Sequence, residues 1–451
     1  MEVTRFENDF FDLKEFSQRL EKFITIEEKY VDGGLVIALN ASYGSGKSTF
    51  LNMWKNDIEA DEENDARPFV IKINAWESDY YGDPLFGLIS ALVHSENEGE
   101  IAAKERVIEA AKDIGWFMTG LGGQVASAVT GVNPIAAGEF AERKKSERDD
   151  RQVKFDSFTL YEDRKKAMSE LQDALRDFVV ESGRLVLFMV DELDRCRPDY
   201  AISYLETIKH IFDIPRAVFM LSADRHQLEN TAKMAFGADL NFDEYYRKFI
   251  HREVQLPQLS EASYVKIVNQ YIKYYLESEG ERNCILSLDS NSRDNIAEVV
   301  KGLRLTPRQT QEVFRILGHT FETSEDKKGR LLWALGVGTI LMAALKVGSP
   351  VKYKEFGLKA ISPEQAYEFI NKLVGDNYTD WWFDIVFTGG GVRMSEGETA
   401  EDVYRKVGLL KEDQALNEIR NFSQLRSGWG NDTRSRIPEI YSKIETVMSW
   451  K

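Results

Sequence analysis

Short, nearly uncharged runs alternate with amphipathic segments through the first 257 residues of the chain. Four of these runs have the length and branched or aromatic composition of strands buried on both faces of a sheet. They are "LVIALN" at 35–40, "FVIKINAW" at 69–76, the apolar run at 185–190 and "AVFMLSAD" at 217–224. Segments with helical periodicity follow them, for example at Ile202, Leu205 and Ile208. This alternation predicts an α/β fold with a parallel sheet.

Beyond Pro257 the pattern becomes helical, so we place a domain boundary there. Residues 1–257 are expected to form the core domain, with an insertion over 100–155. Residues 258–361 are expected to form a helical, lid-like domain, and residues 362–451 a helical region whose role the sequence does not indicate. The uncharged stretch at 114–138 is long enough to span a bilayer, but glycines and an Asn-Pro pair interrupt it. We therefore expect a soluble or partner-docking insertion, with membrane contact as the less favoured alternative.

The stretch "ALNASYGSGKSTF" at 38–50 follows the first predicted strand and fits the phosphate-loop pattern G-x-x-x-x-G-K-[ST]. Ala41 takes the place of the first glycine. Gly44 and Gly46 allow backbone N–H groups to converge, and a helix starting near Lys47 adds the positive end of its dipole. We expect the loop to bind ATP through Tyr43, Gly44, Ser45, Gly46, Lys47, Ser48 and Thr49.

Within this loop, Lys47 is expected to reach the β and γ phosphates, the Ser48 hydroxyl to ligate Mg2+ and Thr49 to lie near the α phosphate. The alternative is a Gly-Ser turn with an incidental lysine. The order of strand, loop and helix favours the phosphate loop.

The apolar run at 185–190 ends in "DELDR", which supplies carboxylates at a strand tip. Asp191 is the expected second protein ligand of Mg2+, and Glu192 the base that orients and deprotonates the attacking water. A solvated acidic turn is the alternative. Ser222 and Asp224, at the end of the next predicted strand, are candidates for contact with the γ phosphate or the water, and capping of the strand end is an equal alternative.

Arg308 follows Thr306 and Pro307, which have the residue types of a helix N-cap and first helical position. A cation at the positive end of a helix is unfavourable, so Arg308 is expected to have a charge partner. A nucleotide phosphate would serve, which makes Arg308 a candidate catalytic residue. The alternative is a surface arginine paired with an acid such as Glu312.

Composition narrows the classes of partner. The formal net charge of −17 excludes a generally basic surface that coats nucleic acid, although local basic patches remain possible. Cys196 and Cys284 are far apart and form neither a disulfide framework nor a metal-ligand pattern. The histidines show no metal pattern either, and His251 is expected to be structural. The amino terminus lacks the features of a signal peptide, so a cytoplasmic protein is expected.

The motifs "SYGSGKST" at 42–49, "NAW" at 74–76 and "DELDRC" at 191–196 together resemble the KAP family of P-loop NTPases. The resemblance extends through "EYYRKFIHREVQLP" at 244–257 and "RLTPRQTQEVF" at 304–314. Tyr43 and Glu192 depart from the tryptophan and aspartate usual in the family. The resemblance implies a P-loop ATPase with an additional strand between the two Walker strands, and some bacterial members resemble components of phage exclusion or antiviral defence.

The sequence thus predicts a magnesium-dependent ATPase that acts as a conformational switch or motor in a bacterial defence or regulatory assembly. The alternative is a nucleotide-binding scaffold with little hydrolysis. A small-molecule kinase lacks support, and a GTPase is disfavoured because no Asn-Lys-x-Asp motif is present. Such ATPases commonly complete their site with a neighbour's arginine, so a homo-oligomer or a complex with a protein partner is expected. The candidate arginines are Arg195, Arg225, Arg247 and Arg252, with Arg247 and Arg252 favoured.

Overall fold

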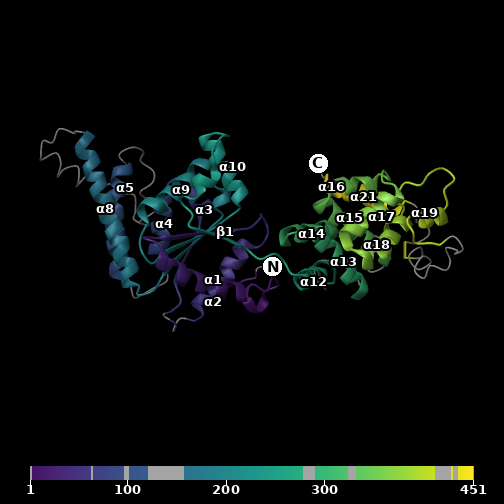
Figure 1. Ribbon diagram of the computed structural model, residues 1–451, viewed down its shortest axis with the longest axis horizontal. Coiled ribbons are helices and arrows are strands. Elements are labelled where there is room, and N and C mark those ends of the chain that lie inside the picture. The colour runs from purple at the N-terminus through teal and green to yellow at the C-terminus, as the bar shows by residue number, and fades with distance from the viewer. Residues whose placement is uncertain are drawn as a thin grey trace. The chain divides into compact units, whose positions relative to one another are not determined.

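The computed structural model describes residues 3–61, 64, 66–95, 101–119, 157–277, 290–322, 332–411, 428–429 and 435–449 (Figure 1). The chain divides into two compact units. The first lies within residues 1–257, apart from loop residues 44–46, and contains the sheet. The second covers residues 258–451 and is helical in its described parts.

The sheet of the first unit has five parallel strands in the order β2-β3-β4-β1-β5. Its strands are β1 (Leu35–Asn40), β2 (Phe69–Asn74), β3 (Val186–Asp191), β4 (Ala217–Ala223) and β5 (Arg252–Gln255). The four predicted strands are therefore present, and the predicted α/β class is confirmed. Because β4 lies between β1 and β3, a strand separates the phosphate-loop strand from the strand that ends in Asp191, as the family resemblance implied.

Strands β1 to β4 carry only two charged residues, Lys72 and Asp191, because both faces of the sheet are covered. In β1, Leu35, Ile37 and Leu39 belong to one hydrophobic core, whereas Val36 and Ala38 belong to another on the opposite face. Alternate side chains of a strand point to opposite faces, so burial on both sides requires a continuous apolar run.

Helices form a layer on each face of the sheet (Figure 1). Helices α1 (Lys14–Glu27) and α2 (Lys47–Glu59) cover one face. The other face packs against α4 (Pro84–Val93), α5 (Ile101–Thr119), α8 (Ser157–Glu181), α9 (Pro198–Ile211) and α10 (Arg225–Phe236). Shorter elements are η1 (Phe6–Asn8), η2 (Glu28–Tyr30), α3 (Ala75–Asp79), η4 (Leu193–Arg195) and α11 (Phe242–Tyr246).

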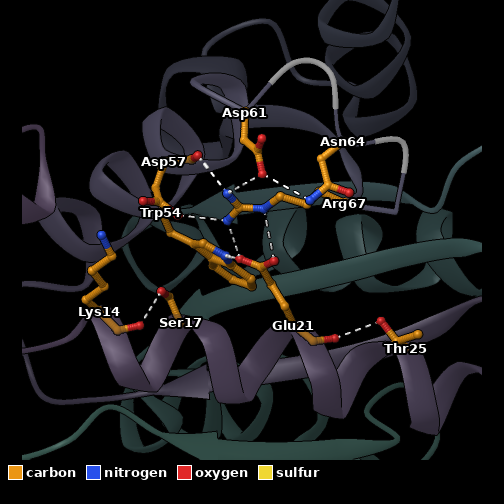
Figure 2. A network of polar contacts seen from close by, with 9 residues as sticks. All are labelled: Lys14, Ser17, Glu21, Thr25, Trp54, Asp57, Asp61, Asn64 and Arg67. Carbon is orange, nitrogen blue, oxygen red and sulfur yellow. Dashed lines mark hydrogen bonds and ion pairs between the residues drawn. The ribbon is translucent and has the colours of Figure 1, made fainter.

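One arginine ties the first helical layer to the sheet (Figure 2). Arg67, just before β2, donates to both carboxylate oxygens of Glu21 on α1, at 3.2 and 2.7 Å. It also donates to the carboxylate and the carbonyl oxygen of Asp57 on α2, both at 2.8 Å. The Trp54 indole N–H donates to the same Glu21 carboxylate. This bidentate arrangement fixes α1 and α2 against the start of β2.

The predicted insertion begins inside the folded core. Ala103, Val107 and Ala111 of α5 are buried in the core that also contains α4 and α9, so the start of the 100–155 segment packs with this unit. Residues 120–156, which include most of the uncharged stretch, lie outside the described residues. No helix in the described part of the chain has both the length and the apolar character needed to cross a membrane.

The second unit is built around one hydrophobic core that runs through both C-terminal regions distinguished by sequence. Helix α15 (Trp333–Gly348) is its most buried element. The remaining elements are α12 (Glu261–Tyr271), the π-helical turn η5 (Ile272–Glu277), α13 (Ser290–Gly302), α14 (Pro307–Glu322), α16 (Pro350–Gly357), α17 (Pro363–Val374), α18 (Asp376–Thr388), α19 (Ala400–Lys406) and α21 (Arg436–Met448).

Candidate nucleotide-binding site

The loop between β1 and α2 has the backbone geometry of an anion-binding turn. Gly44 and Gly46 have φ angles of 76° and 102°, which only glycine adopts readily. Helix α2 begins at Lys47, so the first-turn N–H groups of α2 follow the loop directly. The Ser45 hydroxyl oxygen is buried and has no hydrogen-bond partner among the described residues. The buried Ser45 hydroxyl of this loop is therefore available to a bound ligand.

Lys47 is held at this loop by two contacts. Its ammonium group donates to the carbonyl oxygen of Ala41 at 2.7 Å and lies 3.5 Å from the carboxylate of Asp194. Lys47 is buried, with 9% of its surface exposed. A buried ammonium needs an opposite charge or a set of acceptors, and Asp194 supplies the charge here. This contact brings the phosphate loop and the "DELDR" segment together.

The tip of β3 carries the predicted carboxylates. Asp191 is buried, and its Oδ1 accepts the backbone N–H of Glu192 at 3.0 Å. Glu192 has φ 62°, a left-handed conformation that costs a residue with a side chain of order 1 kcal/mol or more. Such a conformation persists where surrounding contacts hold it. The turn after β3 therefore depends on surrounding contacts that keep Glu192 in a left-handed conformation.

Two side chains hold the Glu192 carboxylate. The Asn74 amide donates to Oε2 at 3.3 Å, and Arg195 lies 2.8 Å from Oε1. Asn74 is the neighbour of Asp191 in the β2–β3 register, and its side-chain oxygen accepts the N–H groups of Trp76 and Glu77 at the start of α3. Asn74 belongs to the motif "NAW" at 74–76, but its role in the site was not predicted from the sequence. Its contact with Glu192 follows from strand pairing, which the sequence does not display.

The two candidate sensor residues differ in their environment. Ser222 is fully buried in β4, opposite Leu39 in the register with β1, and its hydroxyl oxygen has no partner in the described part of the chain. Asp224 caps α10 by accepting the N–H of His226 at 3.0 Å, and its own N–H donates to Asp194 at 2.8 Å. Capping thus explains Asp224. Contact of either residue with a nucleotide stays a prediction.

These residues fit a nucleotide phosphate with Mg2+. The left-handed glycines, the ammonium of Lys47 and the unpartnered hydroxyl of Ser45 suit an anion. The Ser48 hydroxyl and the buried Asp191 carboxylate are oxygen ligands of the kind that Mg2+ prefers. The described residues hold no group of three or more His, Cys, Asp or Glu side chains suited to a metal ion. Magnesium with few protein ligands typically relies on phosphate oxygens and water, which matches this set.

Arg308 lies in the second unit, at the second position of α14. The predicted capping is present, because the Thr306 hydroxyl accepts the N–H of Gln309 at 3.3 Å. Glu312, the acid considered as an alternative partner, lies 3.2 Å from Arg315. The role of Arg308 toward a nucleotide stays a prediction.

Three of the four candidate finger arginines form ion pairs within the first unit, and Arg195 pairs with Glu192 as described above. Arg225 pairs with Asp243 and Glu253, and Arg252 lies 2.5 Å from Glu27. Arg247 is exposed directly after α11.

His251 and Cys196 have structural surroundings. The ring Nδ1 of His251 accepts the N–H of Val36 at 3.0 Å, and burial together with the nearby Lys209 lowers the pKa of His251. Burial and the neighbouring carboxylates raise the pKa of the Cys196 thiol to about 12. A thiol with so high a pKa is a poor nucleophile and metal ligand at neutral pH. Cys284 lies outside the described residues.

Comparison with known proteins gives one family and a few distant relatives. The model of the KAP family P-loop domain matches residues 14–323, more than two thirds of the chain. The phage T7 exclusion protein of Escherichia coli (strain K12) is 22% identical over 265 residues, 52% of this chain and 33% of that protein. The chain thus spans about a third of the length of that relative. Two solved structures of the Aeropyrum pernix ORC2 protein also match over 100% of this chain. The ADPNP-ADP structure has a TM-score of 0.38 and 12% identity, with 97% of its chain covered. The ADP structure has a TM-score of 0.35 and 13% identity, with 95% of its chain covered.

Proposed function

This chain belongs to the KAP family of P-loop domains, and we propose that it is a magnesium-dependent ATPase. The observation that carries the proposal is the 3.5 Å contact between Lys47 and Asp194. It places the lysine of the phosphate loop beside the segment that also contains Asp191 and Glu192. A phosphate-binding group, a metal ligand and a base on adjacent segments are the parts that phosphoryl transfer to water requires.

Each residue has a defined task in this proposal. Lys47 exchanges the Asp194 carboxylate for phosphate oxygens when nucleotide binds. Ser48 and Asp191 hold Mg2+, which when bound offsets the negative charge of the phosphates. Glu192 orients the attacking water and accepts its proton. Arg308 adds positive charge at the phosphates, and Ser222 on β4 and Asp224 directly after it are the residues that would sense them.

The second candidate is a scaffold that binds nucleotide with little hydrolysis. The contacts of Glu192 favour the enzyme. A carboxylate at a strand tip that only made a solvated turn would not need two side-chain donors and a left-handed backbone. These contacts keep a potential base in one position, which is the requirement for general base catalysis.

Phosphate release and nucleotide binding, measured on the same variants, test the proposal. We expect magnesium-dependent release of phosphate from ATP by the wild-type protein, after addition of partner if basal turnover is low. Lys47→Ala should weaken nucleotide binding, whereas Glu192→Gln should bind ATP and retain it without turnover. Normal turnover by Glu192→Gln would exclude Glu192 as the base. Tight binding without turnover by the wild type under every condition would favour the scaffold.

We further propose that the ATP cycle drives a switch or motor in a defence or regulatory assembly. The support is the similarity of about half of this chain to a protein named for phage exclusion. Plating of a panel of phages on bacteria that express the wild-type chain tests the defence role, with Lys47→Ala as the matched control. Protection that needs Lys47 supports it. Equal plating on both strains, together with a cellular protein that copurifies only with ATP, would favour the regulatory role.

A further inference from the structure

The side chain of Arg195 connects the phosphate loop to the Glu192 carboxylate. Its guanidinium carbon lies 5.1 Å from the centre of the Tyr43 ring and 5.6 Å from the centre of the Trp76 ring. Tyr43 belongs to the phosphate loop, and Trp76 lies on α3 after β2. The same guanidinium reaches Glu192 Oε1 at 2.8 Å. A guanidinium donates in its own plane while its faces stack, so one arginine can serve both the rings and the carboxylate.

The exposure of the two rings supports a dedicated arrangement. Tyr43 and Trp76 are 52% and 51% exposed, so burial in a core does not account for aromatic residues at these positions. Each ring within about 6 Å of a cation adds a modest attraction and restricts the rotamers of the arginine. Arg195 is therefore contacted by both rings while its guanidinium also reaches the Glu192 carboxylate.

The turn that carries Arg195 does not need this side chain for its own shape. Backbone N–H groups of Arg195 and Cys196 donate to the carbonyl oxygens of Glu192 and Leu193, at 3.1 and 3.3 Å. Leu193 is fully buried in the core. These contacts close the turn η4, which leaves the guanidinium available for another task.

We propose that Arg195 is a positioning residue for hydrolysis: it holds the Glu192 carboxylate in place, and Tyr43 and Trp76 hold Arg195. This inference rests on the proposed ATPase function. It assigns Arg195 to the site of its own chain, and removes it from the candidates for an arginine supplied to a neighbouring subunit. Because Tyr43 is part of the phosphate loop, a nucleotide bound there would lie next to a residue that holds Arg195.

Steady-state kinetics with MgATP test the assignment through the separation of kcat from KM. Arg195→Ala should lower kcat by about 10- to 100-fold, the scale expected when a catalytic group loses its position, while KM changes less than about threefold. Arg195→Lys keeps the positive charge but not the planar guanidinium, so its kcat should lie between those of the wild type and Arg195→Ala. The control is Arg197→Ala, two residues further along the chain. It removes an arginine that pairs with Asp79, and it should keep the wild-type kcat.

The route through Glu192 has its own test. If Arg195 acts through Glu192, the double variant Arg195→Ala/Glu192→Gln should be no slower than Glu192→Gln alone. Mixing the two single variants should restore no activity. Restored activity in the mixture would show that Arg195 serves a neighbouring subunit and would overturn the proposal, as would a wild-type kcat in Arg195→Ala.

A fluorescence measurement covers the case in which Arg195→Ala folds poorly or turnover is absent. Acrylamide quenching of Trp76 is obtained as the difference between a protein and its Trp76→Phe partner. Arg195→Lys should leave the indole more accessible to acrylamide than in the wild type, and unchanged quenching would refute the stack. If the wild-type protein releases no phosphate, both the ATPase function and the positioning role are wrong. If the wild-type protein is active and the Arg195 variants are unaffected, only the positioning role is wrong.

Discussion

The ammonium nitrogen of Lys47 lies 3.5 Å from a carboxylate oxygen of Asp194, so the lysine expected to bind phosphate is paired with an acid of its own chain. Nucleotide binding must then replace one negative partner of Lys47 by another. Asp194 also accepts the N–H of Asp224, at the end of β4. Asp194 would thus compete with a bound phosphate for Lys47, while it also fixes the start of α10.

Removal of the Asp194 charge is expected to strengthen nucleotide binding. Asp194→Asn keeps an oxygen that can accept the Asp224 N–H but frees Lys47. If the ion pair is worth about 1 kcal/mol, the Kd for ADP should fall about fivefold. Isothermal titration calorimetry measures the change, with Asp199→Asn on the exposed start of α9 as the control. Weaker ADP binding by Asp194→Asn would show that Asp194 contacts the bound nucleotide or its metal.

ATP is expected to promote assembly, and Arg247 is the arginine that the structure favours for a site shared between subunits. The side chains of Arg225 and Arg252 are engaged by acids of the same chain. Light scattering on Glu192→Gln should give a larger mass with ATP than without it. Arg247→Ala should lower stimulated kcat at least tenfold, whereas Arg176→Ala on the exposed side of α8 should not. A monomer that is fully active alone would contradict the assembly model.

Stability of the first unit is expected to fall as the pH drops below about 6.5, the ordinary pKa of histidine. The folded protein lowers the pKa of His251, so the unfolded chain takes up the proton first. The contribution of His251 is complete above pH 6.5 and is lost as the pH falls toward the lowered pKa. Protonation also removes the acceptor of the Val36 N–H. Thermal unfolding at pH 7.5 and 5.5 should show a smaller loss for His251→Gln than for the wild type; equal losses would exclude this histidine as the cause.

A matched pair of glycines tests the packing of the second unit. A Cβ atom at Gly338 on α15 would lie 2.2 Å from the ring of Trp429, whereas at Gly318 on α14 it would meet no atom within 4 Å. Gly338→Ala should therefore destabilise the protein by about 1–3 kcal/mol. Gly318→Ala should stabilise it by up to about 1 kcal/mol, because alanine is the better helix former. Urea unfolding measures both, and equal effects would refute the close contact with Trp429.

Much of the first unit was predictable because its strands are buried on both faces. The runs of β1 to β4, in which Lys72 and Asp191 are the only charged residues, follow directly from that burial. Strand β5, "REVQ", was not predicted as a strand, because it lies at the sheet edge with mostly exposed, charged residues.

The candidate site was predictable in its residue types but not in its contacts. Phosphate-loop spacing identified Lys47 and Ser48, and the strand tip identified Asp191 and Glu192. Arg195 is only three residues from Glu192. The pairing of Lys47 with Asp194 and the contact of Glu192 with Asn74 instead join segments far apart in the sequence. Such contacts depend on strand order and register, for which a single sequence carries no direct signal.

The place of β4 has a consequence for how this P-loop domain can diversify. Because one strand stands between β1 and β3, their ends are separated by two strand spacings, roughly 10 Å, and no backbone ladder joins them. Communication between the two motifs passes instead through replaceable side chains such as Lys47 with Asp194 and Tyr43 with Arg195. Substitutions at these tips can therefore retune the response to nucleotide while the sheet itself is inherited unchanged.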